Sequence, residues 1–149
     1  MKKAVMAAAF AAGLAFASPA IAQETAYTPG SYWVIQGVHV EAGQFENYMD
    51  YIADRYRANQ DIARRQGWIT SYRILANVNR RDGEPDLYLI TEMPRLATPQ
   101  EQVERERIME RQMQQTTRQA EQASGQRVTL RRLGSNMLLQ ELTLRPPRR

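Results

Sequence analysis

The stretch YWVIQGVHV, residues 32–40, decides the fold of this chain. β-branched and aromatic residues alternate along it, which is typical of a strand. The residues that would point to one face of this strand are Trp33, Ile35, Gly37 and His39. The residues that would point to the other face are Tyr32, Val34, Gln36, Val38 and Val40. Neither face is polar throughout, so we expect other parts of the protein to cover both.

A long amphipathic helix is predicted directly after this strand. It runs from about residue 44 to 66, and its buried stripe consists of Phe45, Tyr48, Met49, Ile52, Tyr56 and Ala63, which recur at three- and four-residue spacing. Arg64 and Arg65 suit the negative end of the helix dipole, and Gly67 suits the position just after the helix.

Two further strands, a second helix and a last strand complete the pattern. Strands are expected over 68–78 and 86–93, joined by a tight reversal that contains Asp-Gly and a proline. The second helix begins at a capping box, with Thr98 as N-cap, Pro99 at N1 and Glu101 at N3, and ends at Ser124–Gly125. Residues 126–134 fit a short helix or an irregular edge equally, and the last strand covers 136–144.

This order predicts an α+β protein with the ferredoxin-like βαββαβ motif. Its four-stranded antiparallel sheet would carry two long helices on one face. The face away from the helices would still be apolar, and a monomer does not normally expose so large an apolar surface. We therefore expect a homodimer in which two sheets pack face to face with two-fold symmetry.

The first 22 residues resemble a secretory signal peptide. Lys2 and Lys3 precede a short apolar run, and Ala20-Ile21-Ala22 forms an A-x-A cleavage site. The apolar run is shorter than the roughly 20 residues that a membrane-spanning helix needs, so an uncleaved anchor is the less favoured alternative. Cleavage after Ala22 predicts a periplasmic or secreted protein with no stable membrane anchor. Residues 23–30 would then be a flexible lead-in, 31–145 the barrel domain and 146–149 a disordered tail.

Charge and cysteine content exclude several classes of protein. The chain has a formal net charge of +4, and both lysines lie in the leader, so the balance falls to +2 after cleavage. No basic stripe stands out, so nucleic acid is not an expected partner. The chain has no cysteine, hence no disulfide, and packing alone must stabilise it.

The candidate site residues are one histidine, two charged residues and several aromatics. His39, the only histidine, and Arg73 are the candidate catalytic residues; a structural or interface role for His39 is the alternative. Arg73 and Glu92 lie on the two hairpin strands and would form an ion pair or bind a polar ligand. The residues proposed to line an apolar ligand cleft, together with His39 and Glu92, are Trp33, Trp68, Tyr72 and Tyr88, with plain core packing as the alternative.

No cofactor chemistry is expected from the sequence. One histidine and no cysteine are too few for a zinc site, so no metal is predicted. We find no nucleophile elbow, phosphate loop or dinucleotide glycine pattern.

Several segments together resemble the dimeric α+β barrel superfamily. They are Tyr32 to Gly43, the spacing Phe45…Tyr48…Tyr51, Gln66 to Leu75, and Asp86 to Met93. The superfamily includes NIPSNAP proteins and antibiotic-biosynthesis monooxygenases, and the chain is not assigned to a subfamily. The resemblance implies the fold and a dimer but leaves the chemistry open. Two functions are therefore carried forward: a homodimeric protein that binds a small apolar or aromatic ligand or has a non-catalytic role, and a cofactor-independent monooxygenase or isomerase.

Overall fold

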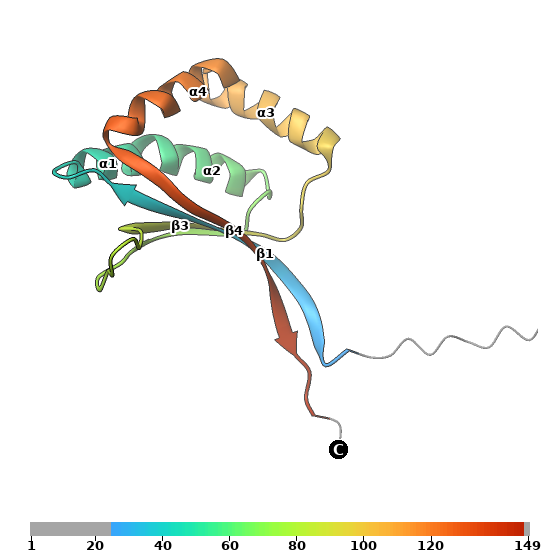
Figure 1. Cartoon of the computed structure of the whole chain (residues 1–149). Coiled ribbons are helices and arrows are strands. Elements are labelled where there is room, and N and C mark those ends of the chain that lie inside the picture. Colours follow the sequence, from blue (N-terminus) through green and yellow to red (C-terminus); the bar gives the residue numbers. More distant parts are fainter. Residues whose placement is uncertain (1–24, 148–149) are drawn as a thin grey trace, which may run out of the picture.

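The computed structural model describes residues 25–147 as an α+β fold with one four-stranded antiparallel sheet. The expected signal peptide and the last two residues of the expected tail lie outside the described residues. The elements in chain order are β1 (Tyr27–Val40), α1 (Phe45–Tyr51), η1 (Ile52–Tyr56), α2 (Arg57–Arg65), β2 (Ser71–Ala76), β3 (Leu87–Met93), α3 (Pro99–Met113), α4 (Thr117–Gln126), η2 (Arg127–Thr129) and β4 (Arg131–Leu144). The strands lie in the order β2-β3-β1-β4 (Figure 1). This arrangement is compatible with a ferredoxin-like fold, although each expected helix is divided.

The core lies between the sheet and the first helical segment. Val38, Leu87 and Leu89 from β1 and β3 pack against Tyr48 and Ile52, and all five side chains are buried. Each such side chain stabilises the fold by roughly 1.5–3 kcal/mol relative to exposure. Four residues of the predicted stripe therefore belong to or pack against this core: Tyr48, Ile52, Met49 and Tyr56. The prediction is wrong for Phe45, which is 44% exposed, and Ala63 is not part of the core.

The first helical segment follows its prediction closely. It spans 45–65 without leaving helical geometry, but its middle, η1, is a π-helical turn, which the sequence did not reveal. Gln66 is the C-cap, and Gly67 follows with φ +70°, a conformation that glycine adopts without a Cβ clash.

The strand boundaries differ from those expected. β2 is shorter than predicted, and β4 begins at Arg131 after the short 3₁₀ turn η2, which resolves the ambiguous 126–134 segment. β1 begins at Tyr27, so four residues of the expected lead-in are strand residues paired with the end of β4. β3 pairs with β1 only from Tyr32 onward, so Pro29 lies where that edge of β1 has no neighbouring strand. Proline has no backbone N–H, and a free edge does not need one.

The second helical segment is two helices where one was expected. α3 begins at the predicted capping box: the Thr98 N–H donates to Glu101 Oε2 at 2.8 Å, and the Glu101 N–H donates to Thr98 Oγ1 at 3.2 Å. The helix ends at Gln114, whose φ of +51° is left-handed. A second capping box, Thr116 with Gln119, then starts α4.

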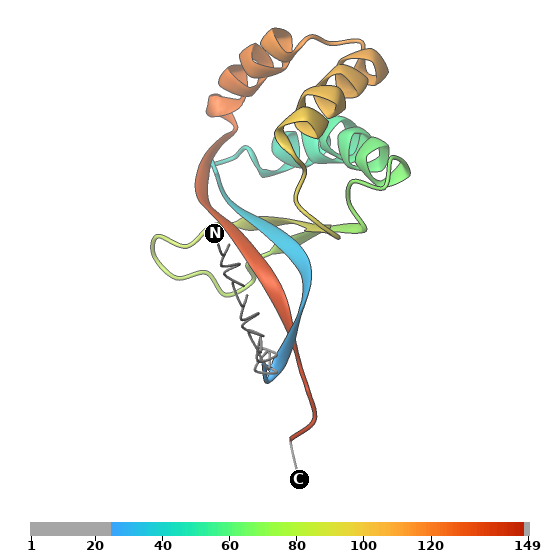
Figure 2. The same cartoon turned by 90° about the vertical axis from the view of Figure 1, so that its right-hand side faces the viewer.

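The two helical segments also pack differently. α1 and α2 lie on the sheet, whereas α3 and α4 form an outer layer beyond them (Figures 1 and 2). No residue of α3 or α4 is buried, and Leu133 and Leu138, on the helix side of β4, stay half exposed. The expectation that two helices cover one face of the sheet is thus wrong for the second segment, because α3 and α4 have too few large apolar residues to displace water from β4.

The sheet face away from the helices carries a row of apolar residues, as the alternation in β1 predicts, and no helix of the described chain covers it. The charged residues Arg73 and Glu92 also lie on this face. We call it the open face. Its apolar residues, placed by the strand register, are Trp33, Ile35, Leu75, Tyr88, Ile90, Met137 and Leu139. The loop between β2 and β3 folds onto one part of it, and Pro85 in this loop packs on Gly37. A Cβ atom on residue 37 would lie only 2.6 Å from Pro85 Cγ, so the contact requires glycine there. Leu75, Met137 and Leu139 remain 49%, 40% and 46% exposed.

Candidate functional site

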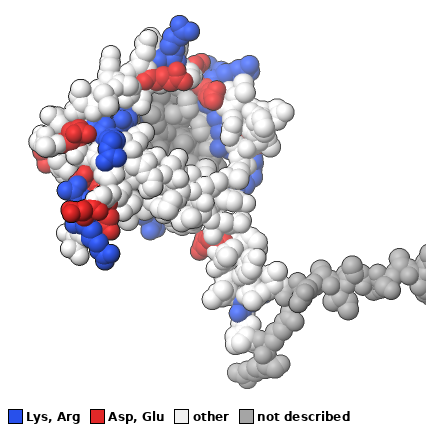
Figure 3. Space-filling view, in the orientation of Figure 1, with Lys and Arg blue, Asp and Glu red and all other residues white. Residues whose placement is uncertain are grey.

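A hollow lies between the two helical layers of the described molecule. Figure 3 shows the surface drawn inward between α3–α4 and α1–α2. Three of the cavities there adjoin, because neighbouring cavities share lining residues. We call them together the interhelical groove; it runs from Trp68 at one end, past Met109 and Met113, to Arg127 at the other.

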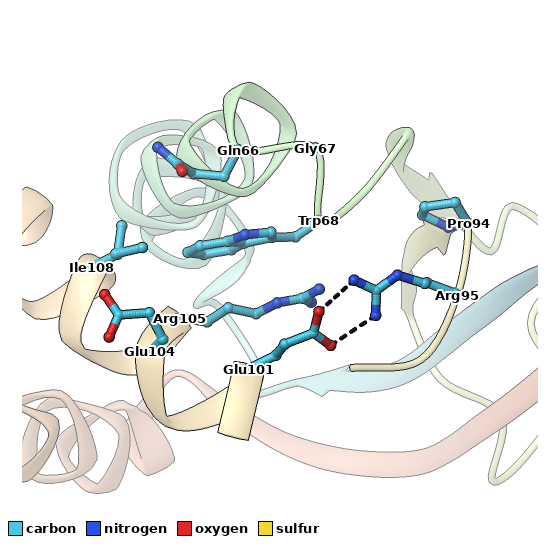
Figure 4. A pocket seen from close by; sticks show the side chains of 9 residues that line it. All are labelled: Gln66, Gly67, Trp68, Pro94, Arg95, Glu101, Glu104, Arg105 and Ile108. Atoms are coloured by element: carbon cyan, nitrogen blue, oxygen red, sulfur yellow. Dashed lines mark hydrogen bonds and ion pairs between the residues drawn. The ribbon is translucent and has the colours of Figure 1, made fainter. Parts of the chain in front are cut away.

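The Trp68 end of the groove is polar and ion-paired. The indole of Trp68 lies over Arg105, whose guanidinium carbon is 5.2 Å from the ring centroid (Figure 4). Arg95 faces Glu101 from the loop after β3, and Arg95 Nη1 donates to Glu101 Oε2 at 2.7 Å. The hydrogen bond from Arg95 and the one from the Thr98 backbone hold the pKa of Glu101 at about 2. The cavity enclosed here has a volume of about 270 Å³.

The middle of the groove is its most apolar part. This cavity has a volume of about 390 Å³. The apolar residues in its lining are Ala63, Trp68, Met109, Met113 and Ala120. Glu110 also lines it, but its Oε1 already accepts hydrogen bonds from the Thr117 N–H at 2.7 Å and the Thr117 hydroxyl at 2.8 Å. These bonds lower the pKa of Glu110 and commit its carboxylate to the start of α4.

The opposite end of the groove is cationic. A cavity of about 180 Å³ there is lined by Arg55 and Arg127, beside Tyr51. The guanidinium of Arg127 lies over the Tyr51 ring, 4.2 Å from its centroid. Asn59, Met113, Gln115 and Ala120 line both this cavity and the apolar one. The groove thus presents an apolar middle that joins a cationic end.

Most of the residues predicted to form the site lie elsewhere. Trp33, His39, Arg73, Tyr88 and Glu92 are on the open face, on the side of the sheet away from the groove. Arg73 lies over the Trp33 ring at 5.9 Å, and the Ser71 hydroxyl donates to Glu92 Oε2 at 2.8 Å, which lowers the pKa of that carboxyl. None of the four described cavities has His39 or Arg73 in its lining.

The remaining two predicted residues lie on the helix side. Tyr72 packs edge-on against Tyr56, and its hydroxyl donates to Asp61 Oδ1 at 3.2 Å. Burial raises the pKa of Tyr72, and the nearby carboxylate of Asp61 adds to that rise. Trp68 alone lines the groove, where it belongs to two adjoining cavities. The structure therefore separates the predicted cleft residues into the open face, the helix side of β2 and the groove.

The groove residues that sequence reasoning missed are those of the outer helices. Met109, Met113 and Ala120 recur at helical spacing, which by itself indicates packing against a neighbouring element. The available signal was their small or unbranched size, since a helix that meets its neighbour through alanine and methionine leaves space. Arg55 gave no signal, because an isolated arginine on a helix is usually solvated. Arg127, with Arg131 and Arg132, has the spacing of a possible anion-binding cluster, but exposed arginines are the simpler interpretation of the sequence.

Two further kinds of feature are absent from residues 25–147. No group of three histidine, aspartate or glutamate side chains is placed to hold a metal ion. No helix in that range is both long and apolar enough to cross a membrane.

Comparison of the chain with known protein families, with curated proteins and with solved structures finds no match.

Proposed function

We propose that this chain is a homodimeric ferredoxin-like α+β barrel protein, periplasmic or secreted, that binds a small apolar or aromatic molecule between its helical layers. The observation that carries the ligand is the cavity of about 390 Å³ lined by Trp68, Met109 and Met113. Its volume lies within the roughly 300–1,000 Å³ of most small-molecule sites, and a largely apolar lining with a few polar groups is typical of them.

The open face supports the dimer. β3 has seven residues, and each extends the strand by about 3.4 Å, so the face is roughly 24 Å long. Four strands spaced about 4.8 Å apart make it roughly 19 Å wide. A stable interface covers about 800 Å² of accessible surface on each partner. The β1–β4 ribbon, which extends beyond the other strands (Figure 1) and carries exposed Tyr27, Leu142 and Leu144, would supply additional area. A second copy presents the same apolar surface, so two-fold packing covers both faces at once.

The outer helices support a ligand. α3 and α4 bury no side chain of their own, yet Trp68, Met109 and Met113 converge on the space beneath them. An apolar molecule in that space would remove these side chains from water and contribute roughly 25 cal/mol for each Å² of apolar surface covered. The loose outer layer is therefore what we expect of a site that admits a ligand.

Fluorescence of Trp68 tests the ligand directly. The chain has two tryptophans, so Trp33→Phe leaves Trp68 as the only reporter. We expect 1-octanol and benzyl alcohol each to shift its emission in a saturable way. Ala120→Phe, which fills the middle of the groove, should abolish the shift.

Ala53→Phe is the matched control, because Ala53 is exposed on η1 and lines none of the four described cavities. It should leave the titration unchanged. The proposed ligand site is refuted if neither alcohol shifts the Trp68 emission in a saturable way. It is also refuted if Ala120→Phe leaves the shift unaltered.

A further inference from the structure

Arg127, at the cationic end of the groove, and Arg131, at the start of β4, both lack an acidic partner among the described residues. Arg131 is 8% exposed, and its Nη2 donates to Ser124 Oγ at 3.2 Å. Arg127 stacks on Tyr51. The Nε atoms of both arginines are buried and have no hydrogen-bond partner. Within residues 25–147 neither arginine forms an ion pair, whereas six other arginine–carboxylate pairs are present.

A buried positive charge with no counter-charge is unfavourable, because removal from water disfavours the ionised group. Arginine stays protonated in proteins and cannot relieve this cost by losing its proton. Of the two arginines, Arg131 is the buried one; Arg127 is half-buried, lines the cavity and has a buried Nε without a hydrogen-bond partner. An anion that binds beside Arg127 would supply the missing counter-charge there. This local charge imbalance therefore indicates a negatively charged ligand.

The surroundings of Arg127 show which part of the groove would hold that charge. Arg127 and Arg55 line the same cavity, and no acidic residue lines it. Arg55 has an ion pair with Asp54 at 3.7 Å, but the Asp54 side chain is 79% exposed. At the Trp68 end, by contrast, Glu101 and Glu104 lie beside Arg95 and Arg105 and already balance the charge.

We propose that the ligand of the interhelical groove is an amphipathic anion with a carboxylate head and an apolar or aromatic body. The carboxylate binds Arg127, with Arg55 beside it, and the body extends along Met113 and Ala120 toward Trp68. This inference rests on the ligand site of the proposed function and adds the chemical class of the ligand and its direction. The apolar middle and the cationic end adjoin through four shared lining residues, so one molecule spans both.

The test compares two probes that share an apolar chain and differ in the head group, octanoate and 1-octanol. Binding is followed by Trp68 emission in the Trp33→Phe protein. Octanoate should bind about tenfold more tightly than 1-octanol, because hydrogen bonds between a guanidinium and a carboxylate are stronger than those to a hydroxyl. Arg127→Gln should reduce the affinity for octanoate to that for 1-octanol and leave 1-octanol unaffected.

Arg118→Gln is the matched control, since Arg118 is an exposed arginine of α4 that lines none of the four described cavities. It should bind octanoate as the parent does. Arg55→Gln, with an expected weaker loss of octanoate affinity, provides a second variant if Arg127→Gln unfolds.

The anion inference is overturned if the parent protein binds both probes with equal affinity. It is also overturned if Arg118→Gln loses as much octanoate affinity as Arg127→Gln does. In both cases the ligand site itself stands. If neither probe binds, the proposed function fails together with the inference.

Discussion

Glu101 shows how one side chain can fix the start of a helix and the edge of a cavity together. Its carboxylate accepts from the Thr98 N–H at 2.8 Å, which closes the capping box, and from Arg95 Nη1 at 2.7 Å. Both partners stabilise the ionised form. Arg95 is thereby held at the rim of the cavity beside Trp68 (Figure 4).

The low pKa of Glu101 predicts acid sensitivity at the start of α3. The folded pKa of about 2 lies below the ordinary value of 4.5, so the ionised carboxylate stabilises the fold above about pH 4.5, and this contribution is lost as the pH falls toward 2. An NMR titration of the Glu101 carboxyl carbon should have its midpoint near 2. In Arg95→Gln the midpoint should move up toward 4.5. A wild-type midpoint near 4.5 would contradict the pairing that the structure shows.

At the scale of the element, the outer helices depend on their ends. α3 and α4 contain no buried residue, so local signals determine where they begin and end. These signals are the capping boxes at Thr98 and Thr116 and the left-handed turn at Gln114. Gln114 is the one described non-glycine residue with positive φ. A side chain there is strained, because Cβ approaches the following carbonyl oxygen.

Two neighbouring substitutions to glycine should therefore have opposite effects. Gln114→Gly relieves the left-handed strain and should raise the free energy of unfolding by about 0.5–1 kcal/mol. Gln112→Gly, in the last turn of α3, should lower it, because glycine in a helix loses more conformational entropy on folding than other residues do. Urea denaturation of both variants measures the difference. Equal effects of the same sign would show that the turn is not strained.

Local signals predicted the elements better than they predicted how the elements pack. The capping box at Thr98, the end of α2 at Gly67 and the two apolar faces of β1 depend on neighbouring residues, and all three are present in the structure. The break before α4 was also readable, since Thr116 and Gln119 repeat the capping-box spacing, but the continuing helical pattern concealed it. The 27–30 strand was missed because it exists only through pairing with β4.

The candidate site was less predictable, for a physical reason. Trp68 was among the aromatic residues predicted to line a cleft, and it lines the groove. The other groove residues Met109, Met113 and Arg127 come from helices whose distance from the sheet no local pattern encodes. Aromatic residues on the open face gave an equally good sequence signal, because a strand that faces a cleft and one that faces a partner subunit have the same composition.

At the scale of the whole molecule, the account rests on the open face. Its leucine and methionine residues on β2 and β4 are 40–49% exposed, and the aromatic residues Trp33 and Tyr88 lie among them. A surface of this kind is unfavourable in water and favours association. β4 also provides an internal comparison, since Leu138 and Leu139 are neighbours with similar exposure, 55% and 46%, and point to opposite faces of the sheet.

Sedimentation velocity at micromolar concentration, applied to the wild-type protein and to Leu139→Arg and Leu138→Arg, tests this claim most directly. The account predicts a dimer for the wild type. Leu139→Arg should be monomeric, because it places an unpaired charge within the open face, and Leu138→Arg should remain dimeric, because its side chain points to the helix side. A wild-type monomer, or a dimer that Leu139→Arg leaves intact, would contradict the account.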